Sequence, residues 1–124
     1  MLPEADDLLA QQLRQLRREY LFDSAKRLDE LRQLGALLAN GERAALADLH
    51  QAFHRLAGSG GSYGFPAVSS TSRDGERLAQ RLKTSGAPLA SDDIKALDQC
   101  IEGVANAFAE AQSADGGDAA SEHG

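Results

Sequence analysis

Apolar residues recur every three or four positions through most of the chain, the spacing that places them on one side of an α-helix. Five such segments, separated by short polar or glycine-containing breaks, cover about residues 4–22, 24–39, 42–60, 66–85 and 91–111. The alternation of apolar and polar residues that is typical of a β-strand does not occur. The sequence therefore predicts an all-α protein.

The first two segments are predicted to be separate helices, since one unbroken helix from residue 4 to 39 would be roughly 54 Å long. Asp23 and Ser24 are good N-cap residues and mark the break. The other stripes are well defined; that of the third segment contains Leu46, Leu49, Phe53, Leu56 and Gly60. Four amphipathic helices joined by short loops predict an antiparallel up-and-down four-helix bundle, with the N-terminal helix as an addition.

Composition and charge limit the possible domain organisation and partners. The chain has 124 residues, 42% of them hydrophobic, which is enough for one core. Residues 1–112 are expected to form that domain, and residues 113–124, which have little to bury, a disordered tail or linker. The net charge of −6 argues against nucleic acid or an anionic membrane as the main partner.

Cys100 is the single cysteine, so no disulfide forms within the chain. The absence of such a bond fits a reducing compartment, and no apolar run approaches the length of a membrane span. From these features we expect a cytoplasmic protein. We also expect the protein to be a monomer.

The third segment carries the candidate chemistry. His54 lies on its polar side, and Gly58 and Gly61 follow four and seven residues later. A glycine inside a helix costs about 1 kcal/mol relative to alanine. Clearance for an approaching partner is a natural reason to place glycines beside a histidine.

These residues resemble a known signature. His54, Leu56, Gly58, Ser59 and Gly64 are similar to the His-x-Leu-Lys-Gly-Ser…Gly pattern of histidine-containing phosphotransfer (HPt) domains. The likeness continues through Phe65-Pro66-Ala67-Val68 to Arg73, Glu76 and Leu78. Two positions depart from the pattern. Ala57 replaces the usual lysine, and Gly75 replaces a core leucine and is expected to weaken the helix behind the site.

The resemblance implies a phosphorelay carrier without catalytic activity of its own. His54 would accept a phosphoryl group from a receiver-domain aspartate and pass it to another receiver. Its partners would be response-regulator receiver domains and a histidine kinase or hybrid kinase. The chain itself would need no cofactor, because Mg²⁺ belongs to the receiver. Histidine suits this task since, with an ordinary pKa near 6.5, it is largely neutral and nucleophilic at cellular pH.

Several residues are candidates for supporting roles. A lysine in place of Ala57 would lie on the helix surface next to His54, so Arg55 or Arg73 is expected to supply the missing cation. Glu76 matches the position of a polar residue that can hydrogen-bond the second ring nitrogen of the histidine, although it could equally be a plain surface glutamate. Arg77 and Arg81 are interpreted as part of a solvated face.

Other classes of protein remain open. The main alternative is a helical adaptor that has the HPt fold but carries no phosphate. His50 and His54, with His123, could bind a metal, but Gln51 stands where a zinc protease of the His-Glu-x-x-His type needs its glutamate. The glycine run closes a helix instead of opening one, unlike a nucleotide-binding loop. A histidine kinase dimerisation helix would have a proline after the histidine.

Overall fold

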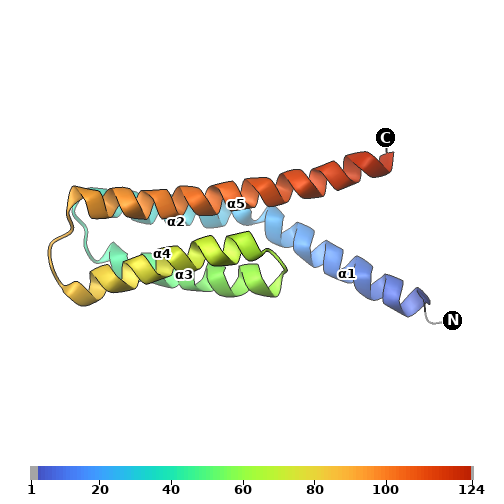
Figure 1. Ribbon diagram of the computed structural model, residues 1–124, viewed down its shortest axis with the longest axis horizontal. Helices are drawn as coiled ribbons and strands as arrows, with labels where there is room; N and C mark the ends of the chain where they lie inside the picture. Colours follow the sequence, from blue (N-terminus) through green and yellow to red (C-terminus); the bar gives the residue numbers. More distant parts are fainter. Residues whose placement is uncertain (1–2, 124) are drawn as a thin grey trace.

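The computed structural model describes the backbone of residues 3–123 and the side chains of residues 7–114. Within this range the chain forms five helices: α1 (Pro3–Phe22), α2 (Ser24–Ala39), α3 (Ala45–Ser62), α4 (Pro66–Ser85) and α5 (Ser91–His123). Figure 1 shows α2 to α5 side by side, with α1 projecting from one end. Residues 3–123 contain no strand, so the all-α prediction is confirmed.

The bundle closes in a ring. Helix α2 packs against α3 and α5, and α4 packs against the same two helices. The predicted stripes supply the core, whose largest fully buried side chains are Phe53, Phe108, Leu31, Leu38, Leu46, Leu49 and Leu97. The predicted four-helix bundle with an additional N-terminal helix is therefore confirmed. Along residues 3–123, no helix has an apolar stretch long enough to cross a membrane.

The predicted break between α1 and α2 is a bend at Asp23. The Asp23 N–H still donates to the Glu19 carbonyl at 3.1 Å, so helical bonding continues into the bend. The Asp23 side chain makes no capping hydrogen bond. Instead, the Gln112 amide of α5 donates to the Leu21 carbonyl at 3.1 Å and to the Ser24 hydroxyl at 2.8 Å. Helix α5 therefore holds the bend in place.

Two helix boundaries differ from the prediction. Helix α3 begins at Ala45 instead of residue 42, because turns occupy residues 41–44 and Gly41 adopts φ +90°. Helix α5 continues to His123, where the sequence predicted a disordered tail from residue 113. Extending an existing helix avoids the cost of nucleation, which allows α5 to continue through Gly116 and Gly117. The domain boundary at residue 112 stays a prediction.

Helices α3 and α4 approach each other closely at two glycines. A Cβ atom on Gly60 would lie 2.9 Å from the Ser69 backbone nitrogen, and one on Gly75 would lie 2.5 Å from Cε1 of Phe53. The Phe53 ring thus fills the space that a leucine at position 75 would need. Helix α4 runs through residue 75 without interruption and packs directly on this ring, so the close contact with Phe53 offsets the expected weakening of the helix by Gly75.

Candidate functional site

His54 lies on the outer surface of α3, past the middle of the helix. Its side chain is 66% exposed, whereas the neighbouring Phe53 is 0% exposed and faces the core. Consecutive residues of a helix point in different directions, so Phe53 lies in the core while His54 next to it is accessible. This placement agrees with the sequence prediction.

Glu76 of α4 contacts the histidine ring. Its Oε2 atom pairs with Nδ1 of His54, and the Glu76 side chain is only 20% exposed. A carboxylate accepts a hydrogen bond, so Nδ1 carries the proton in this pair. In this tautomer the free lone pair of the imidazole is on Nε2. The structure thus places His54 and Glu76 in contact, as their resemblance to the family pattern implied.

The surface next to His54 is open at Gly58. A Cβ atom on Gly58 would meet nothing within 4 Å. On Gly61 it would lie 3.5 Å from the Ser69 hydroxyl, which is an ordinary contact. Both glycines are exposed, and Gly58 lies one turn beyond the histidine. A partner can therefore approach the imidazole along this side of α3.

Ala57 does not lie where the sequence placed it. Its exposed fraction is 5%, and its carbonyl accepts a hydrogen bond from the buried Ser69 hydroxyl of α4 at 2.7 Å. The expectation that residue 57 lies on the free surface beside His54 is wrong. The reason is the close approach of α4, which covers this side of α3.

Ala57→Lys is therefore expected to destabilise the protein without improving any reaction at His54. The lysine stem would have to leave the α3–α4 seam or carry its ammonium into it, at a cost of about 1–3 kcal/mol. Thermal denaturation followed by circular dichroism measures this loss. A variant with an unchanged melting temperature and faster phosphorylation would contradict the buried placement.

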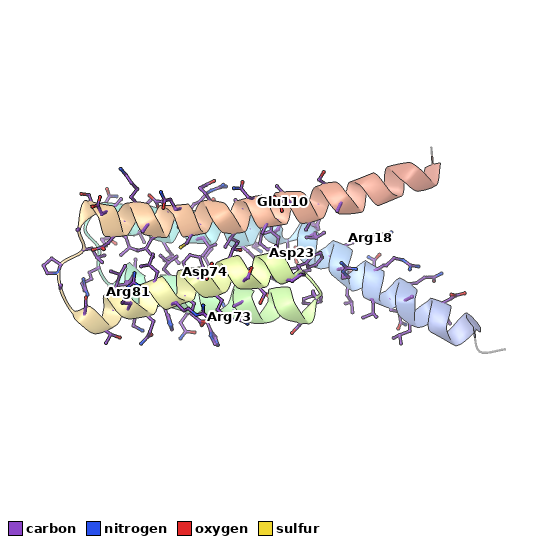
Figure 2. The ribbon with its side chains drawn as sticks, viewed as in Figure 1. Arg18, Asp23, Arg73, Asp74, Arg81 and Glu110 are labelled. Atoms are coloured by element: carbon purple, nitrogen blue, oxygen red, sulfur yellow. The ribbon has the colours of Figure 1, made fainter. Side chains whose placement is uncertain are left out.

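The two arginines proposed to replace the cation have different surroundings. The guanidinium of Arg55 pairs with the Glu30 carboxylate of α2 at 3.1 Å, which directs it toward α2. Arg73 lies on an exposed position of α4, three residues before Glu76. Figure 2 shows it on the outer side of the α3–α4 pair. Among residues 7–114, Arg55 is held by an ion pair, whereas Arg73 is not.

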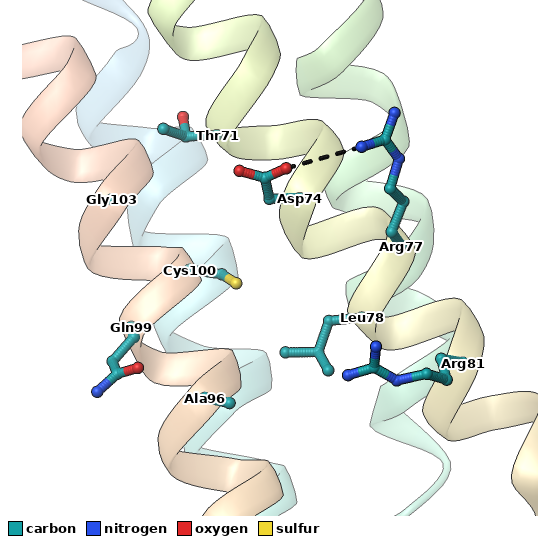
Figure 3. Close-up of a pocket in the computed structure, with 9 residues that line it drawn as sticks. All are labelled: Thr71, Asp74, Arg77, Leu78, Arg81, Ala96, Gln99, Cys100 and Gly103. Carbon is teal, nitrogen blue, oxygen red and sulfur yellow. Dashed lines mark ion pairs between the residues drawn. The ribbon is translucent and has the colours of Figure 1, made fainter.

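The two arginines that the sequence assigned to a solvated face lie away from His54. Arg77 and Arg81 line an open groove between α4 and α5, and Arg77 forms a 3.9 Å ion pair with Asp74 (Figure 3). Cys100 lines the same groove. Burial and the nearby Asp74 carboxylate raise the pKa of its thiol, so less of it is thiolate at neutral pH. This groove is separate from the histidine.

The metal-binding alternative finds no support in the described side chains. His50 is half-buried, and its Nδ1 has no hydrogen-bond partner among residues 7–114. In the same range no three His, Cys, Asp or Glu side chains are placed to hold one metal ion. The His123 side chain lies outside the described residues.

Sequence reasoning missed Ser69, Phe53 and Glu30 as parts of the site's surroundings. Ser69 anchors Ala57, Phe53 fills the gap at Gly75, and Glu30 engages Arg55. A signal for the first two was present in α4, where small residues recur at buried positions three or four apart: Ser69, Ser72, Gly75 and Ala79. Such a stripe favours a close helix contact. No pattern in the sequence pointed to Glu30.

Comparison with known families agrees with this fold. Residues 4–107 match the family model described as Hpt domain. Searches of curated proteins and of solved structures found no match. The chain belongs to the Hpt domain family. Members of this family act as phosphocarriers in two-component signalling, where they interact with receiver domains and kinases.

Proposed function

We propose that this chain carries a phosphoryl group on Nε2 of His54, accepted from a receiver-domain aspartyl phosphate and passed to a second receiver. The observation that carries the proposal is the contact between Glu76 and Nδ1 of His54. It keeps the proton on the inner nitrogen of an imidazole whose side chain is 66% exposed. The outer nitrogen, Nε2, then carries no proton and can attack phosphorus directly.

The transfer needs no separate general base. The Nε2 lone pair forms the N–P bond while the bond between phosphorus and the aspartate oxygen breaks, and the aspartate leaves as a carboxylate. Nδ1 keeps its proton throughout. The ring gains positive charge as the N–P bond forms, and the Glu76 carboxylate stabilises that charge. The reverse sequence returns the group to a receiver.

The transfer has two further requirements, which this chain and the partner share. In-line transfer needs open space along the axis of attack and positive charge around the equatorial oxygens. The bare surface at Gly58 supplies the space. Arg55 is engaged by Glu30, so we assign most of the neutralisation to the docked receiver and its Mg²⁺, with Arg73 as this chain's own contribution.

The direct test is to incubate the protein with a phosphorylated receiver domain and analyse the label that it acquires. We expect a phosphoryl group that is lost in acid, is stable in alkali and maps to the peptide containing His54. An unlabelled protein that still binds the receiver would instead support the adaptor alternative. A label with the acid stability of a phosphoester would contradict both functions.

Replacing Glu76 tests its positioning role. Glu76→Ala is expected to slow phosphorylation of His54 about 10- to 100-fold, since a hydrogen bond to a charged group is worth about 1.5–3 kcal/mol. Glu76→Gln should lose less, because the amide oxygen still accepts from Nδ1 but carries no charge. Single-turnover transfer from a phosphorylated receiver measures both rates.

The neighbouring exposed carboxylate of Asp74 offers a matched control. It is on the same helix but faces the groove between α4 and α5 (Figure 3). Asp74→Ala should therefore leave the transfer rate unchanged. Equal rates for wild type, Glu76→Ala and Glu76→Gln would show that Glu76 does not position the imidazole.

A further inference from the structure

Over its described side chains, helix α1 is anchored to the bundle at its C-terminal end. Tyr20 is 3% exposed, and its ring stacks on Tyr63 with centroids 4.7 Å apart. Toward the N-terminus the same side of α1 leaves the bundle, and the exposed fractions rise to 45% at Leu16, 53% at Leu13 and 57% at Leu9. An apolar stripe thus begins in the core and continues into solvent.

The spacing of this stripe is that of a helix-pairing seam. Leu9, Leu13, Leu16 and Tyr20 are separated by four, three and four residues, as are the a and d positions of a coiled coil. Leu8, at 59% exposure, widens the apolar surface. Leucines so exposed over more than two turns of one helix indicate an interaction surface.

The described part of this chain offers nothing to cover the leucines. Figure 1 shows α1 and the C-terminal turns of α5 diverging from the same end of the bundle. After Phe108, α5 continues as Ala-Glu-Ala-Gln-Ser-Ala over residues 109–114, with no large apolar side chain. The surface is therefore open to a helix or an apolar face of another molecule.

The charges along α1 identify an occupant. Residues 3–12 contain Glu4, Asp6 and Asp7 and no basic residue, whereas residues 13–22 contain Arg14, Arg17, Arg18 and one acid, Glu19. A helix with opposite charges at its two ends is complementary to itself when a second copy runs antiparallel. A parallel copy would place like charges together.

We propose that the leucine stripe of α1 pairs two copies of this chain, with the two α1 helices antiparallel about a twofold axis. The same surface is then used by both copies, as a closed dimer requires. The seam is short, so the association is weak, with a dissociation constant in the micromolar range. Such a dimer would overturn the expectation of a monomer drawn from the sequence.

Sedimentation velocity of the full chain, from low micromolar to near-millimolar concentration, tests the pairing. Wild type should shift from monomer to dimer, and Leu13→Glu should raise the dissociation constant at least about tenfold by placing a charge in the seam. Leu37→Glu is the matched control, because Leu37 is an exposed leucine of α2 outside the stripe. This variant should dimerise as wild type does. Circular dichroism confirms that both variants remain helical.

Salt dependence tests the orientation. Raising the salt concentration from about 0.05 to 0.5 M screens the charges and should weaken an antiparallel dimer. A dimer that tightens over this range would overturn the antiparallel arrangement. A wild type that stays monomeric, or a dimer unaffected by Leu13→Glu, would overturn the pairing itself. A third outcome would also overturn the proposal: the wild type is a monomer, and Leu13→Glu abolishes phosphoryl transfer from a receiver. The leucine stripe would then be a docking surface for the receiver.

Discussion

Replacing His54 with glutamine should abolish phosphorylation of the chain while leaving its fold intact. The side chain is 66% exposed and contributes no core contact, so the free energy of unfolding should change by no more than about 0.5 kcal/mol. Glutamine can also donate an N–H to the Glu76 carboxylate, which prevents that half-buried group from losing its partner. Transfer from a phosphorylated receiver and a thermal melt measure the two effects.

His50→Gln is the control for this experiment. His50 lies one turn earlier on α3 and is half-buried. We expect the variant to be phosphorylated at the wild-type rate, because the proposed mechanism gives His50 no part. Label that disappears with His50 and persists without His54 would move the acceptor to the other histidine. Unfolding of the His54 variant would show that the imidazole supports the structure.

Adding a single methyl group at Gly75 should destabilise the protein. The new Cβ would lie 2.5 to 2.7 Å from three atoms of the Phe53 ring, which is fully buried. Overpacking of a core typically costs about 1–3 kcal/mol, and the better helix propensity of alanine returns at most about 1 kcal/mol. For Gly75→Ala we therefore expect a net loss of about 1–2 kcal/mol and a fall in melting temperature of roughly 5–10 °C.

Two further variants isolate the cause of this loss. Gly58→Ala makes the same chemical change on α3 where a Cβ meets nothing, so it should be neutral or stabilising by up to about 1 kcal/mol. Phe53→Leu removes the ring edge. Combined with Gly75→Ala, it should cost less than the sum of the two single changes. Strict additivity would mean that the ring and the methyl group do not compete for the same space.

The sequence by itself determined the helices and the reacting residue. Apolar spacing of three and four residues depends only on local geometry, and it identified the five helices and the buried stripe of α3 around Phe53. The same geometry placed His54 on the polar side. The glycines after it, together with the Hpt-like signature, indicated the chemistry. These features are local, so they can be interpreted without knowing what packs against each helix.

Tertiary structure decided everything that depends on the distance between helices. Ala57 is buried because α4 comes close enough for Ser69 to bond its carbonyl, and Gly75 is required because Phe53 reaches across from α3. Glu76 meets His54 only because the register of α3 against α4 aligns them. The leucines of α1 have the spacing of a buried stripe, yet the bend at Asp23 carries them past the end of the bundle. Periodicity shows which face of a helix is apolar, but it cannot show whether another helix reaches that face.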